Sequence, residues 1–582
     1  MLKECIEIFK KEYDDKGEAL LTDSYILGRG DYFIVKSNGD YSHIKVDKNT
    51  VPQTEENYDY LAQRDYLSGL LSINKPIDGT KKIHSNNYLS FFIKNNVIIE
   101  NKAQVIKSIK SFYETLKNPL LKYKNDKNKK ISYTSIEEEI GKPDEERIDN
   151  IQKWIEDNLW KLQEETDGGK EYLKIFFEAD IEQYKKENKR YIIPNIYTST
   201  NFNVMIDNMT YGLPNNNLNL NSKKPFLENK TRKKGYRVPY LLNEEDVYMQ
   251  KKFFDLLFNF SNTGERNIYF SEKGIFTYKD GKMPSEKIIG YYMRIVKDKS
   301  EAEIQRFDII NSFEPNLKKK LYIMDYLKKE RKSEYSKLNY GSEISKLDEF
   351  NKLIDNLIFN KKLRGIIFEN IKDLKLKDPR IKYIGNLYKN IFYDLLIKGD
   401  LSGFFKIYKK LFIYCIKGKL INGKDFDACD MYNLMISIKE SWDCKEESFM
   451  TEVKEIRKKL KDCFEKEEGW LENDKEYYFA MGQVAQYLLS KKKSTNKTHE
   501  ITIRFIDAKN NEQLKKELVH LFKRYGYDIS LYNKRFNLLF EMVMDYVPKS
   551  KKIDEDKLLC GLLSNSLIYE KAKTKNDKNE EV

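Results

Sequence analysis

The hydrophobic pattern of this chain changes near Leu317, and the change limits the folds that the chain can adopt. Before that point, short segments of alternating apolar and polar residues lie between helical segments. After it the strand signals vanish, and apolar residues recur every three or four positions to the end of the chain. Alternation is typical of half-buried strands, whereas the longer spacing places apolar side chains on one face of a helix. The sequence therefore predicts an α+β fold with a mixed α/β N-terminal region and a predominantly helical remainder.

Two hairpins stand out in the N-terminal region. The first joins residues 32–36 and 41–46 around Asn38-Gly39, a pair that favours a tight turn in which both residues have positive φ. The second spans residues 268–278 around Glu272 to Gly274. Further strands are expected at residues 172–177 and within residues 288–310.

The chain of 582 residues is long enough for several domains. We expect a mixed α/β domain over residues 1–316, a helical middle region over 317–430 and a C-terminal helical bundle over 431–582. The Gly- and Asp-rich stretch 417–430 is a candidate linker between the last two. In the bundle, the spacing predicts helices over residues 431–463, 475–489, 512–525, 534–547 and 554–571.

Motifs for common chemistries are missing from the sequence. The six cysteines are scattered without a C-x-x-C pair, and no two of the four histidines stand at metal-ligand spacing. There is no phosphate-binding loop, serine elbow, signal peptide or membrane-length apolar run. We therefore expect a cytoplasmic protein without membrane contact, metal, cofactor or catalytic residues. A nuclease whose metal-binding acids are dispersed along the chain stays open.

The charge distribution favours a polyanionic partner. Lys and Arg number 105 against 92 Asp and Glu, a net charge of +13. Residues 215–237 concentrate this excess, because an Asn-rich loop runs directly into seven basic residues with one acid, Glu228. Lys and Arg neutralise phosphates, and an Asn amide offers a donor and an acceptor to a base edge. A solvated low-complexity loop is the competing interpretation.

Three other basic stretches have similar alternatives. The lysine-rich residues 102–130 are either a flexible solvated loop, which we favour, or a phosphate track. Residues 81–88, KKIHSNNY, are either a nucleic-acid contact or a loop in which two amides cap turns. The lysines of residues 491–497 either face nucleic acid or complement a helix dipole. Trp442 and Trp470 are expected to anchor the core or a subunit interface rather than stack on bases.

Several long blocks together resemble one protein family. The blocks are residues 72–94, 189–203 and 211–233 in the N-terminal half, and residues 477–499 and 554–571 near the C-terminus. They are similar to the large subunit of the type I-B CRISPR interference complex, Cascade, of the Cas-eight-b or Csh-one family. Their order and spacing agree over most of the chain, least well over residues 317–429.

The resemblance implies a non-catalytic subunit of a ribonucleoprotein in antiviral defence. Its partners would be a CRISPR guide RNA, double-stranded target DNA, the Cascade backbone and guide-handle-binding subunits, separate small subunits and a nuclease-helicase. Such a subunit reads a short protospacer-adjacent motif (PAM) in duplex DNA, helps to part the strands into an R-loop, and supports nuclease recruitment. Base pairing with the guide supplies the sequence specificity.

The resemblance also suggests where these contacts lie. PAM and DNA contacts are expected at Asn215, Asn216, Asn217, Asn219, Asn221, Lys223, Lys224, Lys230, Arg232, Lys233 and Lys234. Contacts with the guide handle or its subunit are expected at Lys81, Lys82, His84, Asn86 and Asn87. A track for the displaced strand is expected at Lys491, Lys492, Lys493 and Lys497.

The C-terminal bundle resembles the small subunit of related complexes, fused in place. Met450, Met431 or Met435 would then be candidate internal starts for a separate small subunit. Two other classes of protein remain as alternatives: a metal-dependent nuclease of a mobile element, and a scaffold that binds only protein.

Overall fold

A computed structural model of the protein describes residues 1–50, 56–197, 200, 203–207, 209–214, 241–298, 301–329, 336–376, 378–442, 448–491 and 500–570. The fold is α+β, with 55% helix and 17% strand, so the predicted class is confirmed. The chain divides into two compact units. The first comprises Met1–Lys282 and Ile289–Ile310, and the second comprises Met283–Ile288 and Asn311–Val582.

A four-stranded mixed sheet lies at the centre of the first unit's larger core. Its order is β2-β1-β4-β3, and its strands are β1 (Gly30–Val35), β2 (Tyr41–Val46), β3 (Ser90–Lys94) and β4 (Tyr172–Phe177). β1 pairs antiparallel with β2 and parallel with β4, while β3 and β4 are antiparallel. The predicted hairpin is confirmed, but its turn is not the expected one. Lys36 N donates to Asp40 O at 2.8 Å, and within the turn only Gly39 has a positive φ, of 90°.

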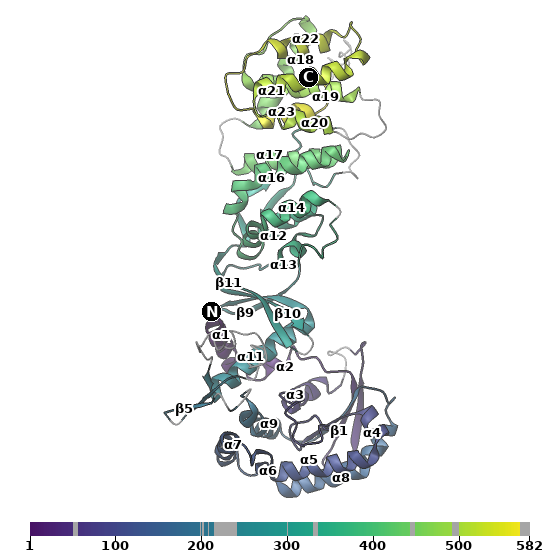
Figure 1. Cartoon of the computed structure of the whole chain (residues 1–582), viewed down its shortest axis with the longest axis vertical. Coiled ribbons are helices and arrows are strands. Elements are labelled where there is room, and N and C mark those ends of the chain that lie inside the picture. The colour runs from purple at the N-terminus through teal and green to yellow at the C-terminus, as the bar shows by residue number, and fades with distance from the viewer. Residues whose placement is uncertain are drawn as a thin grey trace, which may run out of the picture. The chain divides into compact units, whose positions relative to one another are not determined.

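Helices cover this sheet. They are α3 (Tyr58–Ser68), α4 (Asn95–Glu100), α5 (Lys102–Lys117), α6 (Leu120–Tyr123), α7 (Lys127–Ile140), α8 (Glu145–Glu164) and α9 (Ile181–Asn195). α5 packs along α8, as Figure 1 shows. The favoured interpretation of residues 102–130 as a loop is therefore wrong. Val105, Ile109 and Phe112 are buried on one side of α5, and this apolar stripe makes the lysine-rich segment helical.

A second sheet and its helices complete the first unit's other core. Its order is β11-β10-β8-β9, and its strands are β8 (Glu265–Ser271), β9 (Gly274–Lys279), β10 (Ile288–Asp298) and β11 (Glu301–Phe313). Phe9 of α1 (Leu2–Lys16) and Phe253 of α11 (Glu244–Thr263) pack with Phe270 of β8. The short α2 (Ala19–Thr22) contacts both helices. A small sheet, β5 (Val204–Ile206), β6 (Met209–Gly212) and β7 (Leu242–Asn243), precedes α11.

The second unit opens with a β-ribbon of β12 (Asn316–Tyr322) and β13 (Glu343–Lys346), so strands do not end at residue 317 as predicted. Helices follow: α12 (Leu347–Ile354), α13 (Leu363–Phe368), α14 (Pro379–Leu387), α15 (Lys389–Tyr393), α16 (Ser402–Ile421) and α17 (Asp425–Trp442). Two π-helical turns, η3 (Asp355–Phe359) and η4 (Asp394–Lys398), extend α12 and α15.

The prediction of a linker at residues 417–430 is wrong, because these residues form the end of α16 and the beginning of α17. Only residues 422–424 connect the two helices. Asp430 and Met431 are buried within α17. The boundary expected between residues 430 and 431 thus falls inside α17. A stretch rich in Gly and Asp can be helical when the apolar residues beside the Gly and Asp are buried against other parts of the protein.

The C-terminal bundle contains α18 (Phe449–Lys466), α19 (Asp474–Ser490), α20 (Glu500–Ile506), α21 (Asn511–Tyr525), the 3₁₀ turn η5 (Gly526–Asp528), α22 (Lys534–Asp545) and α23 (Glu555–Leu563). α19 is its central helix and contacts α18, α21, α22 and α23. The single helix predicted over residues 431–463 is instead α17 and α18. The helix predicted over residues 554–571 ends early, at Leu563.

Candidate nucleic-acid interface

Three lysines from separate segments of the first unit meet at the C-terminal end of α9. Lys75 lies in the loop between α3 and β3, Lys122 in α6 and Lys129 in the first turn of α7. We call these three residues the lysine cluster. Asn195, the last residue of α9, links Lys75 and Lys129 through its backbone carbonyl and its side-chain oxygen.

The Lys75 ammonium group is held by two backbone carbonyls. Its Nζ donates to Asn195 O and to Tyr197 O, both at 2.6 Å. The Tyr191 hydroxyl donates to Lys75 O at 2.7 Å and so fixes the backbone from which the side chain extends. Cations are favoured at a helix C-terminus, where backbone carbonyls lack intrahelical partners. This end of α9 therefore orients Lys75 without a carboxylate.

Lys122 and Lys129 complete the cluster with the same kind of partner. Lys122 Nζ donates to Pro76 O and lies 5.3 Å from the centre of the Tyr191 ring. Lys129 Nζ donates to Asn195 Oδ1 at 3.2 Å. Among the residues that the structure describes, no carboxylate forms an ion pair with any of the three. Within the described ranges, the three lysine side chains thus have only neutral oxygen atoms as their hydrogen-bond partners.

The pKa values of Lys75 and Lys122 reflect the absence of a paired carboxylate among the described residues. Burial and, to a smaller extent, the neighbouring charges of Lys129 and Lys122 together lower the pKa of Lys75 to about 7, against the opposing charge of Asp126. Burial also lowers the pKa of Lys122 to about 7, with Lys129 acting in the same direction and Asp78 against it. An anion bound beside these two ammonium groups would favour their charged forms and raise both pKa values. Strongly shifted pKa values mark candidate binding sites, and here they favour a ligand of negative charge.

Tyr197 connects the cluster with the ends of the Asn- and Lys-rich stretch. It forms an isolated β-bridge with Pro214, and its hydroxyl donates to Leu242 O at 3.1 Å. All the predicted PAM and DNA contacts, from Asn215 to Lys234, lie outside the described residues. Pro214 and Leu242, which are described on either side of that stretch, therefore both contact Tyr197. Tyr197 is also one of the two residues whose carbonyls hold Lys75.

The predicted guide-handle residues divide into two groups. Lys81 is exposed and Lys82 half-buried, so these two residues remain candidate contacts. Asn86 and Asn87 are buried at 1% and 0% exposure. Asn86 Nδ2 donates to Leu67 O and Gly69 O, and Asn87 Nδ2 donates to Ser68 Oγ and Asn86 Oδ1. Because their amides bond to the end of α3 and to each other, we remove these two residues from the set of candidate contacts.

His84 also has internal partners. Its Nδ1 lies 2.5 Å from the Tyr172 hydroxyl and its Nε2 lies 3.2 Å from Lys81 O. A carbonyl accepts only, so Nε2 carries the proton and the neutral ring accepts from Tyr172 at Nδ1. Burial lowers the pKa of His84, which agrees with this neutral form. The side chain therefore positions the loop that carries Lys81.

In the bundle, Lys491 lies against two aromatic rings. Its Nζ is 4.6 Å from the Tyr487 ring centre and 5.2 Å from that of Tyr569. Lys492, Lys493 and Lys497 lie outside the described residues. Of the candidate internal starts, Met431 and Met435 are buried within α17, and Met450 lies in the first turn of α18. Trp442 packs against Phe350 and Phe405, whereas Trp470 is 71% exposed.

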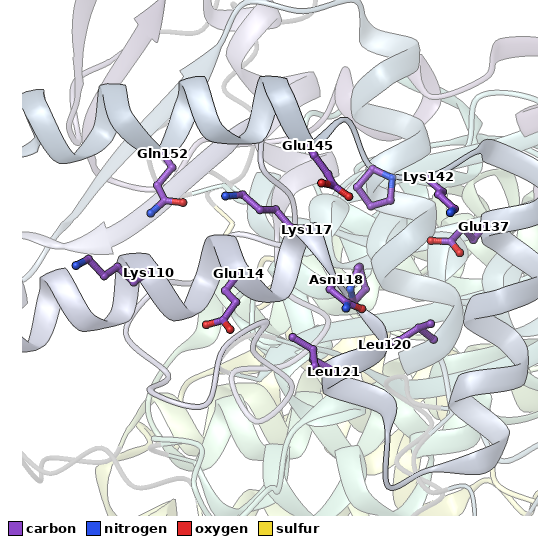
Figure 2. Close-up of a pocket in the computed structure, with 12 residues that line it drawn as sticks. Lys110, Glu114, Lys117, Asn118, Leu120, Leu121, Glu137, Lys142, Glu145 and Gln152 are labelled. Carbon is purple, nitrogen blue, oxygen red and sulfur yellow. The ribbon is translucent and has the colours of Figure 1, made fainter.

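A pocket of about 700 Å³ lies beside α5, α6 and the start of α8 (Figure 2). Three lysines and three glutamates share its wall, as Figure 2 shows: Lys110, Lys117, Lys142, Glu114, Glu137 and Glu145. Lys117 is already paired with Asp149. The balanced charge gives this pocket no preference for an anion, so it is a weaker candidate than the lysine cluster.

No group of three or more His, Cys, Asp or Glu side chains is placed to hold a metal ion in the part of the chain that the structure describes. Among the same residues, no helix has the length and apolar character needed to cross a bilayer. No family model, curated protein or solved structure matches the chain.

Sequence reasoning did not find the lysine cluster. Lys75 belongs to the block of residues 72–94, but its charged neighbours Lys81 and Lys82 gave the stronger signal there. Lys122 and Lys129 belong to the lysine-rich stretch, where nothing in the local pattern separates a buried lysine from a solvated one. The contact with Asn195 joins distant parts of the chain, so only the fold reveals it.

Proposed function

We propose that this chain is a non-catalytic, nucleic-acid-binding large subunit of a type I-B CRISPR Cascade complex, which reads the PAM and promotes R-loop formation. The observation that carries the proposal is the meeting of sequence blocks at the lysine cluster. Lys75 from the block of residues 72–94 binds the backbone of Asn195 and Tyr197 from the block of residues 189–203. Tyr197 in turn pairs with Pro214 from the block of residues 211–233.

The phosphates of a nucleic-acid partner would supply the negative counter-charge that the lysine cluster lacks among the described residues. Phosphates neutralise ammonium groups and release counterions, and this gain does not depend on base sequence. The lysine cluster would therefore bind the phosphate backbone of the nucleic acid, while the neighbouring Asn-rich stretch would read its bases. In this proposal Asn215, Asn216, Asn217, Asn219 and Asn221 remain the candidate base-reading residues, and Lys81 and Lys82 remain candidate contacts with the guide handle.

The test is a gel-shift titration of a reconstituted guide-loaded complex, with and without this chain. The targets are duplexes that match the guide and carry randomised flanks. We expect one short flanking motif to be enriched only when the chain is present. The variant Lys75→Gln/Lys129→Gln should weaken binding to all flanks alike, whereas the exposed control pair Lys107→Gln/Lys153→Gln should not.

Other outcomes would favour other classes of protein. Binding that is unchanged by the chain and by the flanks would contradict the proposal. Magnesium-dependent cleavage by the isolated chain would indicate a nuclease. Assembly with protein partners and no contact with any nucleic acid would indicate a scaffold.

A further inference from the structure

A second pocket, in the helical unit, carries an excess of positive charge that the proposed function does not use. Its volume is about 700 Å³. It is formed by the loop after η3, the segment that leads into α14, and the end of α16 with the turn that follows. Its cationic residues are Lys362, Lys375, Arg380, Lys419 and Lys424, and its one acid is Asp378.

In the described part of the chain, only one of these five cations, Lys419, forms an ion pair. Asp427 accepts from Lys419 at 3.1 Å and so neutralises it. Asp378 is occupied as the N-cap of α14, where its Oδ1 accepts from Arg380 N at 2.9 Å. Among the described residues, no ion pair involves the other four cations of the pocket: Lys362, Lys375, Arg380 and Lys424. Their charge remains available to a ligand.

Arg380 is held in position by a glycine. Its Nη1 donates to Gly418 O at 3.3 Å. A Cβ atom at position 418 would lie 3.1 Å from both Cδ and Nη1 of Arg380, closer than side chains normally pack. The absence of a side chain there lets the guanidinium lie across α16. The pocket therefore combines one fixed cation with three lysines at its rim, Lys362, Lys375 and Lys424, which are exposed.

The lining of the pocket suits a phosphate group. Lysine ammonium groups bind phosphate as point charges, and the arginine fork matches the geometry of phosphate oxygens. The one aromatic ring in the lining, Phe359, is fully buried and offers no face to a base. A pocket of this size holds a small ligand or a short stretch of one strand, and a duplex is too wide for it. It would therefore contact backbone without reading sequence.

We infer that this pocket binds the phosphate backbone of a single nucleic-acid strand. The inference deepens the proposed function and rests on it for the identity of the partner. It assigns a second, sequence-independent contact to residues 359–424, a region without a predicted site.

The test measures how the full chain binds a fluorescent single strand of mixed sequence, by anisotropy over a series of salt concentrations. The variant Lys362→Gln/Lys375→Gln/Lys424→Gln removes three exposed charges without touching the core. Lys509→Gln/Lys523→Gln/Lys551→Gln removes the same charge from exposed lysines of the bundle. We expect the pocket variant to bind at least about tenfold more weakly at low salt, with a log–log salt slope shallower by about 0.7 for each lost contact. The control should keep the wild-type slope.

Arg380→Lys supplies a second variant that keeps the charge. It should weaken binding less than Arg380→Gln, and thermal unfolding of each variant verifies that it is folded. Two competitors at matched ionic strength, inorganic phosphate and a polyglutamate peptide, identify the ligand. We expect neither to displace the strand from the wild-type chain at concentrations where unlabelled strand does.

The results separate the two proposals. If the wild-type chain, alone and in the complex, binds no nucleic acid, both are overturned. If the wild type binds and the pocket variant matches the control in affinity and slope, only this inference is overturned. Selective displacement by inorganic phosphate or by polyglutamate would overturn the assignment to a strand and give the pocket to a small anion or an acidic protein segment.

Discussion

Gly482 and Gly561 allow the backbones of α19 and α23 to touch in the C-terminal bundle. A Cβ atom at Gly482 would lie within 3 Å of Leu558 O, and one at Gly561 would lie within 3 Å of Phe479 O. The obstacle in both cases is backbone, which cannot move aside as a flexible side chain can. Gln483 adds a hydrogen bond from its Nε2 to Gly561 O at the same crossing.

We therefore expect Gly561→Ala to destabilise the protein by about 3 kcal/mol or more, because the helices must separate to admit one methyl group. Gly482→Ala should act in the same direction. Gly79→Ala is the control, since open space surrounds that position, and it should change stability by less than about 0.5 kcal/mol. Chemical denaturation followed by circular dichroism measures all three. Equal stability of Gly561→Ala and the control would contradict the close packing of α19 on α23.

A buried ion pair, Asp65 with Lys174, lies beneath the first sheet. Lys174 Nζ donates to both carboxylate oxygens, at 2.6 and 2.9 Å, and the Tyr25 hydroxyl donates to one of them at 3.0 Å. The side chain of Asp65 is only 1% exposed. Lys174→Met should cost about 3–5 kcal/mol, because it leaves the carboxylate buried without its counter-charge.

The pair of Lys189 and Glu139, whose side chains are 35% and 57% exposed, provides the matched control for that change. Lys189→Met should cost less than about 1 kcal/mol, since water screens both partners. The double variant Asp65→Asn/Lys174→Met should recover part of the loss, because no charge is then left unpaired. If Lys174→Met were no more destabilising than Lys189→Met, the pair would not be buried as described.

The sequence was a good guide to the elements whose pattern is local. Alternation identified β1 and β2, but the turn between them has one left-handed residue instead of two, because loop length as well as residue type decides the turn. Lysine-rich composition misled at α5, where the stripe of Val105, Ile109 and Phe112 outweighs the charge. Composition also misled at residues 417–430, since burial of residues such as Asp430 depends on distant partners. Tyr340 is one such partner, whose hydroxyl donates to Asp430 Oδ1 at 2.7 Å.

The candidate site was less predictable, for a related reason. The sequence left open whether Asn86 and Asn87 contact nucleic acid or bond within the protein, and the fold turns both amides inward onto the end of α3. Nothing in the local pattern singled out Lys75, because its partners Asn195 and Tyr197 come from another part of the chain. Local sequence records which side chains are polar, and the fold decides which of them are used internally.

His84 makes stability depend on pH in the acid range. Burial lowers its pKa in the folded state, so the unfolded chain takes up a proton first as the pH falls. The stability associated with neutral His84 is therefore present at pH 7 and is lost as the pH falls below about 6.5. We expect His84→Gln to lose less stability than the wild type between about pH 7 and about pH 5. The exposed His520→Gln should follow the wild type, and identical curves for all three proteins would contradict the assignment.

Binding of nucleic acid to the lysine cluster should weaken as the pH rises. Lys75 and Lys122, whose pKa values burial lowers to about 7, lose their protons near neutral pH in the free protein. A bound phosphate favours the charged forms, so above pH 7 binding must be accompanied by proton uptake, and affinity falls.

We expect the wild-type complex to bind duplex DNA several-fold more weakly at about pH 8.5 than at about pH 6.5, a larger change than ordinary lysines would give. The variant Lys75→Gln/Lys122→Gln should bind more weakly and with a smaller pH dependence, the remainder coming from Lys129, whose pKa burial also lowers. Lys81→Gln/Lys82→Gln should keep the wild-type pH dependence. Gel shifts at constant ionic strength measure this. A wild-type affinity that does not change over this range would mean that no phosphate lies beside these two ammonium groups.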